Sequence, residues 1–446
     1  MMNKYHELMI NTSNICKKNN VDDWELIISD SVSVSANSFK HEIIKEASSF
    51  SSALSIRVIK NGKEGCASTQ LLDSSELESL VERAIDNATL YDKTEKPIIF
   101  DEKVSYKEIK NLTELNYNLS DIKKLALKAL ETLYKKDNRV IDGSTCSAAY
   151  GKSIRYFASS KGLELIQSSD DAYLMANCKV SDNSDIQNAY SVKEGLIDNA
   201  DITDSVDKAI KQLNPNKVES GSYNIIFSPD AMNQILDTFF SVFTGKSSAY
   251  SLTRYKDKEG ERIASEKLTI IDDPFYSGYR MQASFDGDGH PCYTKNVIEN
   301  GVLKTLLYNL EYGSKCGKAS TGNGYRSAIS GASGIASYSF YIKPSELSLE
   351  ELCKICNNGI YVTQMKGFHA GANAITGDFS IESAGFRIRD SKVCEPINEF
   401  TVSGNFYKLL ENVVEVANDL EFDVTLSSER FGTPSVLVKD LAVSGK

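Results

Sequence analysis

The sequence lacks the features that would tie the chain to a membrane, to secretion or to nucleic acid. Its 446 residues contain no apolar run approaching the roughly 18 residues that a bilayer-spanning helix needs. The polar N-terminus, MMNKYHELMINTSNICKKNN, has no apolar core of a secretory signal. The net charge is −11 and no Lys/Arg-rich run exists, whereas nucleic-acid binding rests on clustered cations. We therefore expect a cytoplasmic protein that contacts neither membrane nor nucleic acid.

Cysteine is present without a disulfide or metal pattern. The nine cysteines are scattered and odd in number, which indicates reduced thiols in a cytosolic protein. Cys353 and Cys356 form a CxxC in ELCKICNNG. A zinc site would need two further ligands at matching spacing, and a redox CxxC would stand at the start of a helix. This pair lies midway in a helix-like segment, so we expect two thiols packed one turn apart.

Common catalytic motifs are also missing. The sequence has no GxSxG elbow, no P-loop, no GxGxxG after a strand and no HExxH. Histidine occurs four times, as His6, His41, His290 and His369. The first two have no neighbouring acid or thiol cluster, and we expect them at the surface.

The first half of the chain predicts an α+β arrangement. A strand begins at Trp24, and hairpins are expected at Asn61-Gly62 and at Lys161-Gly162. Between them, an amphipathic helix is expected to begin at the cap Ser120. Strands in local hairpins, separated by helices, favour an α+β layer with an antiparallel sheet over a wound parallel sheet.

A chain of this length is expected to form two domains. The polar segment LNPNKVESGS places the boundary between an N-terminal α+β domain, 1–215, and a β-rich C-terminal domain, 216–446. The second domain also predicts a hairpin at Asn300-Gly301 and shorter helices near 349–357 and 406–416.

One long helix stands out at the start of the second domain. Ser228 fits its N-cap, Pro229 its first position and Gly245 its C-terminal end. Apolar side chains cover more than half of its circumference, so we expect it buried at the centre of its domain. These side chains are Met232, Ile235, Leu236, Phe239, Phe240 and Phe243.

Two segments carry more polar chemistry than a scaffold requires. In SFDGDGHPCY, a glycine-rich turn holds Asp286, Asp288, His290 and Cys292 close together in the sequence. These side chains could ligate a metal or form a polar turn between strands. No second histidine lies nearby, which favours the polar turn. The second segment, GFHAGANAITGDFS at 367–380, could let a peptide main chain come close or could bond its polar side chains to its own backbone. Its polar residues are His369, Asn373, Thr376, Asp378 and Ser380.

Six segments of the second half, taken in order, resemble the PmbA/TldE branch of the TldD/PmbA family. They are VIENGVLKTLLYN, STGNGYR (which contains Arg326), GFHAGANAITGDFS, FTVSGNF, VANDLEF and FGTPSVLVKDLAVSG. The resemblance runs from Tyr223 onward and is diffuse before it. It implies an N-terminal α+β domain, a C-terminal β-rich domain wrapped around one long helix, and a heterodimer with a zinc-carrying TldD-like subunit.

The resemblance also implies that this chain has lost the zinc site. In TldD the central helix bears HExxxH, and a cysteine near the C-terminus completes the site; aligned on Gly245, the motif falls on Leu236 to Ser241. Leu236 and Ser241 replace the two histidines, and Asp237 stands where TldD has its general-base glutamate. No cysteine follows Cys394. We expect no catalytic residue and no metal in this chain, with zinc in the TldD-like partner.

The favoured hypothesis is a zinc-less subunit of a cytosolic metallopeptidase complex that helps to hold extended or unfolded peptides. It pairs with a TldD-like subunit, or with itself when alone. The loop residues at 367–380 and Arg326 are the candidates for contact with peptide or partner. Two alternatives stay open: a stand-alone hydrolase using Asp286, His290 and Cys292, and a non-enzymatic interaction protein of the gyrase-modulator type.

Overall fold

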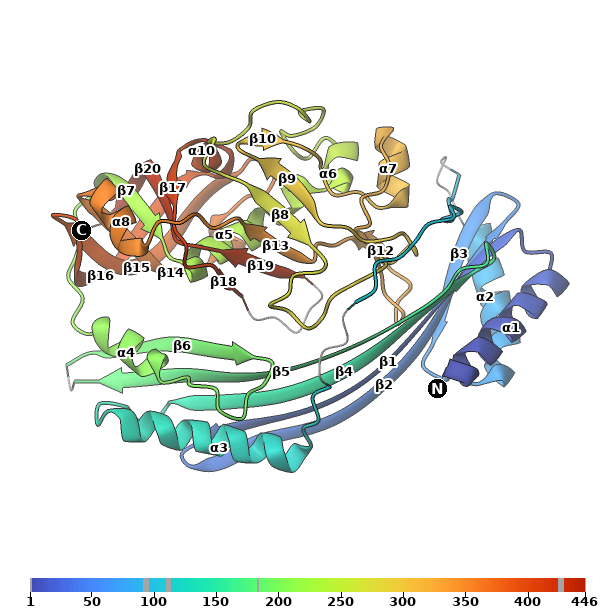
Figure 1. Ribbon diagram of the computed structural model, residues 1–446, viewed down its shortest axis with the longest axis horizontal. Helices are drawn as coiled ribbons and strands as arrows, with labels where there is room; N and C mark the ends of the chain where they lie inside the picture. The colour runs from blue at the N-terminus through green and yellow to red at the C-terminus, as the bar shows by residue number, and fades with distance from the viewer. Residues whose placement is uncertain (1, 91–95, 110–113, 183, 424–428, 446) are drawn as a thin grey trace.

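We analysed a computed structural model that describes residues 2–90, 96–109, 114–182, 184–423 and 429–445. A curved sheet carries the C-terminal half on its concave side (Figure 1). None of the described helices is long and apolar enough to cross a membrane.

The first 194 residues supply all six strands of the curved sheet, and every neighbouring pair is antiparallel. In spatial order the strands are β3 (Lys63–Thr69), β2 (Glu42–Lys60), β1 (Asp23–Phe39), β4 (Thr145–Ser159), β5 (Glu164–Ser181) and β6 (Ile186–Glu194). The expected turns are present at both hairpins. Asn61 and Gly62 take φ values of 54° and 74°, and Gly162 takes 84°, which is the left-handed region that such turns need.

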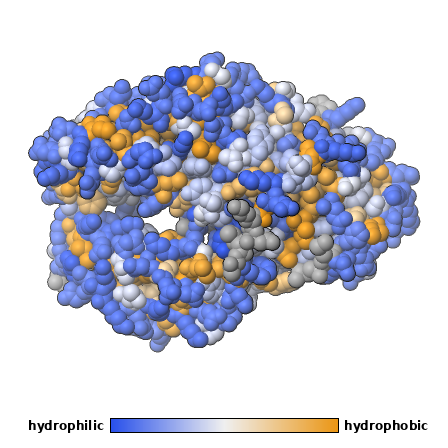
Figure 2. All heavy atoms as spheres, viewed as in Figure 1, coloured by the Kyte–Doolittle hydropathy of each residue, from blue (hydrophilic) through white to orange (hydrophobic). Residues whose placement is uncertain are grey.

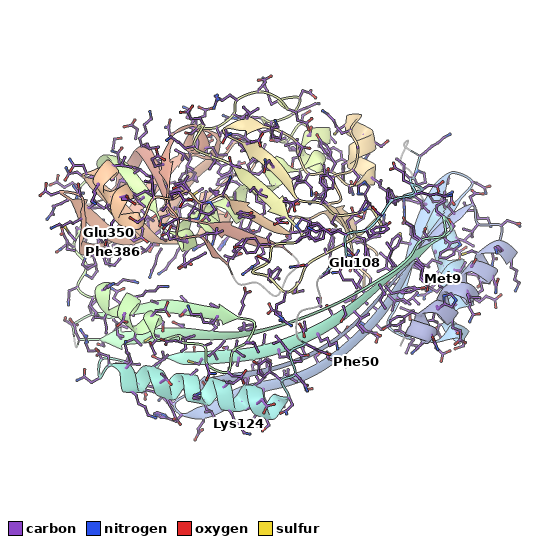
Figure 3. All side chains as sticks on the ribbon, in the orientation of Figure 1. Met9, Phe50, Glu108, Lys124, Glu350 and Phe386 are labelled. Carbon is purple, nitrogen blue, oxygen red and sulfur yellow. The ribbon has the colours of Figure 1, made fainter. Side chains whose placement is uncertain are left out.

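Helices cover the two ends of the outer, convex face of this sheet (Figure 1). At one end lie α1 (Met2–Lys18) and α2 (Leu77–Thr89), the latter preceded by the 3-10 turn η1 (Ser74–Glu76); at the other lies α3 (Leu119–Lys136). A short helix, α4 (Asp204–Lys211), packs near β6. The middle of the outer face stays open, and Phe50, 72% exposed, projects from it (Figure 3).

The N-terminus of α3 differs from the prediction. The cap is Asn118 and not Ser120, because Asn118 is extended and its side chain accepts a hydrogen bond from the Asp121 amide at 3.1 Å. The Asp121 carboxylate in turn accepts a hydrogen bond from the Asn118 amide at 3.2 Å. This reciprocal capping box satisfies two backbone donors at once, which a serine inside the first turn cannot do.

The C-terminal half contains a small barrel. Its strands run β16 (Lys392–Asn405), β15 (Asp378–Arg389), β14 (Gly359–Lys366), β7 (Gly221–Phe227) and β20 (Val436–Ser444), and β16 also pairs with β20, which closes the ring. β17 (Val413–Val416) joins the outer side of β20. The closing contact involves Thr401, Val402 and Ser403 of β16.

A second six-stranded sheet faces this barrel across the core. In spatial order it holds β10 (Val302–Leu303), β9 (Lys295–Glu299), β8 (Ile270–Asp273), β13 (Ser339–Ile342), β19 (Arg430–Thr433) and β18 (Glu421–Phe422). A separate ribbon pairs β11 (Gly324–Arg326) with β12 (Ser333–Ile335). The remaining helices are α6 (Gly245–Ala249), α7 (Leu310–Cys316), α8 (Leu349–Cys356), α9 (Phe368–Gly371) and α10 (Phe406–Glu411).

The central helix of this half is α5 (Pro229–Phe239), and it lies within the largest apolar cluster of the protein. Ser228 caps it, with its side chain accepting from the Ala231 amide, and Pro229 occupies the first turn, as predicted. The six apolar residues predicted to be buried are buried. The predicted α+β class, with a β-rich part around a buried helix, is confirmed.

The end of the central helix was predicted wrongly. The α-helix stops at Phe239 and continues as a 3-10 turn, η2 (Phe240–Phe243), while Gly245 begins α6. The glycine serves close packing, because a Cβ there would lie 2.2 Å from the Tyr308 ring. The helix expected over 406–416 also ends early, at Glu411, since the chain enters β17 at Val413 and pairs with β20.

The predicted division at 215/216 stays a prediction, but the sheets lie on either side of it. Strands up to β6 build the curved sheet, and strands from β7 onward build the other sheets. Cys353 and Cys356 lie on α8 as buried free thiols, as expected. Burial raises the pKa of Cys356 to about 11, which makes it a poor nucleophile at neutral pH.

Candidate functional site

The positions that match the zinc motif lie on α5 and the turn after it. Leu236 is completely buried in the core around the helix, while Asp237 and Ser241 are exposed on its other side. Leu236 therefore acts in packing. A hydrocarbon side chain cannot ligate zinc, and a neutral hydroxyl is not among its usual ligands. The residues present at these positions do not fit a zinc ion.

Carboxylates gather beside this face of α5. Burial raises the pKa of Asp423 to about 6; the Phe431 amide, which donates to its carboxylate at 2.7 Å, opposes the rise and the charge of Asp237 adds to it. Partial loss of water around the carboxylates likewise raises the pKa values of Glu429 and of Asp237, whose side chain is still exposed on one side. In the described part of the chain, no three His, Cys, Asp or Glu side chains are arranged to hold a metal ion.

An arginine joins the two halves of the molecule near these carboxylates. The guanidinium of Arg430, on β19, lies 4.3 Å from the ring centres of both Tyr279 and Phe422 and pairs with Glu194 at the end of β6. Burial raises the pKa of Glu194 to about 7, and the Arg430 charge opposes the rise without cancelling it. The pair fixes the edge of the curved sheet to the C-terminal half. Figure 2 shows an opening between the curved sheet and this half.

We expect this glutamate to make stability pH-dependent. The pKa of Glu194 is raised from 4.5 to about 7 in the folded chain, so the folded chain holds this proton more tightly than the unfolded chain does. The protonated side chain therefore adds to the free energy of unfolding at acid pH, and this addition is lost as pH rises from 4.5 to about 7. We compare the free energy of unfolding in urea of wild type and Glu194→Gln at pH 5 and at pH 8. Between these pH values wild type should lose up to about 3 kcal/mol more than the variant. An unchanged difference between the two proteins would contradict the assignment.

The cluster at 286–292 is a turn whose polar groups are already engaged. Asp286 is completely buried and accepts bonds from the amides of Asp288, His290 and Gly324 at 2.7–2.9 Å. Asp288 accepts from Arg326 at 2.8 Å and from the Leu310 amide at 3.2 Å. Burial and the charge of Asp288 raise the pKa of Asp286. Burial alone would raise the pKa of Asp288, but Arg326 holds it below its usual value.

The other two members of this cluster point elsewhere. His290 shares a hydrogen bond between Nδ1 and the Pro291 carbonyl at 2.9 Å, and its ring packs on Phe100. The Cys292 thiol donates to the Tyr338 hydroxyl at 3.0 Å, and burial raises its pKa far above the usual value. A thiol held protonated is neither a nucleophile nor a metal ligand. This arrangement suits a structural turn better than a stand-alone hydrolase.

The loop at 367–380 is exposed but bonded to its own domain. Asn373 accepts from the amides of Ile375 and Thr376, and the Thr376 hydroxyl accepts from the Asp378 amide. Asp378 accepts from Asn405 at 2.8 Å, and Ser380 shares a hydrogen bond with Ser403 at 2.9 Å. His369 lies exposed on the short helix α9. The loop is thus largely self-bonded, and its contact with peptide or partner stays a prediction.

Arg326 belongs to a different place, the seam between the curved sheet and the C-terminal half. It pairs with Asp288 at 2.8 Å and lies 3.7 Å from Glu25 of β1. Glu25 pairs in turn with Arg57 of β2 at 2.8 Å. Sequence analysis missed Glu25 and Arg57. A signal existed, because each is a lone charge inside an apolar strand, in WELII and LSIRVI, and buried charges are normally paired.

Comparisons with known proteins agree with this architecture. The model described as "PmbA/TldA metallopeptidase C-terminal domain" matches residues 220–445, and that described as "PmbA/TldA metallopeptidase domain 1" matches 24–88. Metalloprotease PmbA of Escherichia coli O157:H7 is 24% identical over 437 residues, which cover 95% of this chain and 93% of that protein. A metalloprotease of Methanothermobacter thermautotrophicus is 29% identical over 330 residues, which cover 68% of this chain and 71% of that protein.

Solved structures share the whole fold. A protein described as a modulator of a DNA gyrase from Thermotoga maritima superposes with a TM-score of 0.89 at 26% identity, covering 99% of this chain and all of that one. TldE of Thermococcus kodakarensis superposes with a TM-score of 0.82 at 23% identity, covering 98% of this chain and all of that one. This likeness shows a shared fold. The order of motifs, the barrel around α5 and the match over residues 220–445 lead to one conclusion: this chain belongs to the PmbA/TldD metallopeptidase family.

Proposed function

We propose that this chain is the zinc-free subunit of a TldD/TldE-type cytoplasmic peptidase complex, in which a TldD-like subunit carries the zinc. The observation that carries the proposal is the surroundings of α5. Leu236 occupies a predicted ligand position and is buried among Phe and Leu side chains, so the helix serves the core instead of a metal. Relatives named metalloproteases support a role in peptide hydrolysis.

In this proposal the chain helps to hold an extended peptide for its partner. β6 ends the curved sheet, and within the described residues β5 is its only strand partner; Ile186 and Tyr190 on it are 61% and 54% exposed. A free strand edge can bind an extended main chain by adding a strand, largely independent of sequence. The exposed His369 and Asp378 remain the candidates for contact with the peptide or the partner.

The proposal is tested with the purified chain, the TldD-like chain of the same organism, and the co-expressed pair. Zinc is measured by elemental analysis, and hydrolysis is followed on an unfolded, fluorescently labelled peptide. We expect no stoichiometric zinc and no hydrolysis with this chain alone, and zinc-dependent hydrolysis by the pair that exceeds that of the partner alone. Zinc-dependent hydrolysis by this chain alone would overturn the proposal.

The same assay tests the loop. Replacing His369 and Asp378 together by alanine should leave folding nearly unchanged, because both side chains are exposed, and should slow hydrolysis by the pair. Glu350→Ala, on the exposed side of α8 (Figure 3), is the control and should leave the rate unchanged. Full activity of the double variant would remove the loop from the proposed contact surface.

A further inference from the structure

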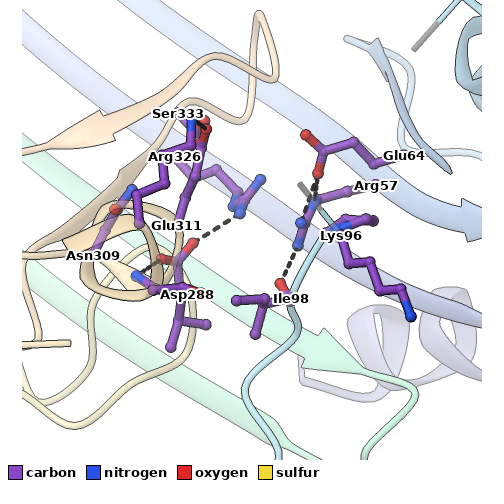
Figure 4. A pocket seen from close by; sticks show the side chains of 13 residues that line it. Arg57, Glu64, Lys96, Ile98, Asp288, Asn309, Glu311, Arg326 and Ser333 are labelled. Atoms are coloured by element: carbon purple, nitrogen blue, oxygen red, sulfur yellow. Dashed lines mark hydrogen bonds and ion pairs between the residues drawn. The ribbon is translucent and has the colours of Figure 1, made fainter. Parts of the chain in front are cut away.

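A pocket opens on the seam between the curved sheet and the C-terminal half, away from the family's zinc-helix positions. It encloses about 130 Å³ and is lined from both halves of the chain. A water needs only about 10–15 Å³ by this kind of measure, so the pocket can hold several waters or a small organic acid. Figure 4 shows the guanidinium of Arg326 reaching across it, between Asp288 and Arg57.

The two arginines of the pocket differ in how fully they are bonded. Arg57 donates to Glu25 at 2.8 Å, to Glu64 at 2.7 Å and to the Ile98 carbonyl at 3.0 Å. Arg326 donates to Asp288, but its buried Nε finds no hydrogen-bond partner among the residues that the structure describes. The Arg326 side chain is only 10% exposed. A guanidinium N–H left unsatisfied in a buried place costs free energy, so Arg326 keeps a bonding capacity that its pairing with Asp288 does not use.

The charge of the lining limits what can supply that oxygen. Arg57, Lys96, Lys315 and Arg326 carry four positive charges, and Glu64, Asp288 and Glu311 carry three negative charges. The lining therefore has a net charge of +1, which Glu25, buried behind Arg57, brings to zero. A dianion such as phosphate would meet three nearby carboxylates without sufficient positive charge to offset them. A singly charged group leaves only half of that excess of negative charge.

We propose that this pocket binds a carboxylate group, held by the guanidinium of Arg326. Planar guanidinium and planar carboxylate are matched in geometry, and hydrogen bonds between them are among the strongest in proteins. Pro97, Ile98 and Leu310 form an apolar part of the wall for the carbon atoms of the ligand. The carboxylate can come from a free amino acid or from the C-terminal residue of a peptide.

The inference concerns the isolated chain and does not depend on a zinc-carrying partner. Binding is measured by calorimetry on the full purified chain with acetate, alanine, the dipeptide Ala-Ala, its C-terminal amide and inorganic phosphate. We expect the three carboxylates to bind and the amide and phosphate to fail. Equal binding of acetate, alanine and Ala-Ala identifies a free carboxylate as the ligand. Tighter binding of Ala-Ala identifies a peptide C-terminus.

Two variants test the location. Arg326→Gln should weaken carboxylate binding about tenfold or more, because it removes a charged donor. Ser314→Trp should do the same by filling the pocket from an exposed position on α7, with the ion pairs untouched. Ala319→Trp, exposed and outside the lining, is its matched control and should bind as wild type does. The proposal is overturned if no carboxylate binds, if phosphate binds as tightly, or if Ser314→Trp binds like the control.

Discussion

Phe239→Asp is expected to unfold the C-terminal half of the chain. Phe239 is completely buried on α5, its ring stacks on Phe406 at 4.6 Å between centroids, and Phe379 lies at 6.2 Å. Truncating a buried Phe costs about 3–5 kcal/mol, and an unpaired buried carboxylate adds a further penalty. Because the total exceeds much of a typical domain's stability, the cooperative melting transition of this half should disappear in circular dichroism.

Two controls separate loss of packing from the mere presence of a new charge. Gln234→Asp puts the same carboxylate on an exposed position of the same helix and should change stability by less than about 0.5 kcal/mol. Phe239→Leu keeps an apolar side chain of smaller volume and should retain the fold with a lower melting temperature. If Phe239→Asp melted like wild type, α5 would not be the centre of the C-terminal core.

Features with a local cause were predictable from the sequence. The hairpins at Asn61-Gly62 and Asn300-Gly301 follow from residues that tolerate positive φ. The start of α5 follows from the order Ser228, Pro229 and an apolar face. Each of these signals is complete within a few residues, so no distant partner is needed to read it.

Features that depend on distant partners were not predictable in the same way. Gly245 looked like a helix end, but its absent Cβ makes room for Tyr308, 63 positions further on. The barrel closes because β16 meets β20, and neither strand records that pairing in its own pattern. Among the site candidates, the turn at 286–292 has the right residue types for a metal, and only the backbone amides bound to Asp286 reveal its structural use.

Arg57→Met is expected to destabilise the seam by about 3–5 kcal/mol, as removal of one partner from a buried ion pair does. Glu25 is 1% exposed, and Arg57 is the nearest cation to it in the described part of the chain, at 2.8 Å; Arg326 lies farther off, at 3.7 Å. Without Arg57, the Glu25 charge stays buried and largely uncompensated, and Glu64 loses a bond of 2.6 Å as well. Chemical denaturation followed by fluorescence and circular dichroism should show an earlier unfolding transition.

A double variant separates the effect of the unpaired Glu25 charge from the effect of losing the Arg57 side-chain volume. Combining Arg57→Met with Glu25→Leu removes both charges and leaves apolar groups of similar size, so the double variant should recover much of the stability lost in Arg57→Met. Lys18→Met is the control for an exposed pair, because Lys18 and Glu78 are 72% and 54% exposed; it should leave the unfolding transition nearly unchanged. Equal losses in the single and double variants would mean that packing of Arg57, and not its charge, stabilises the seam.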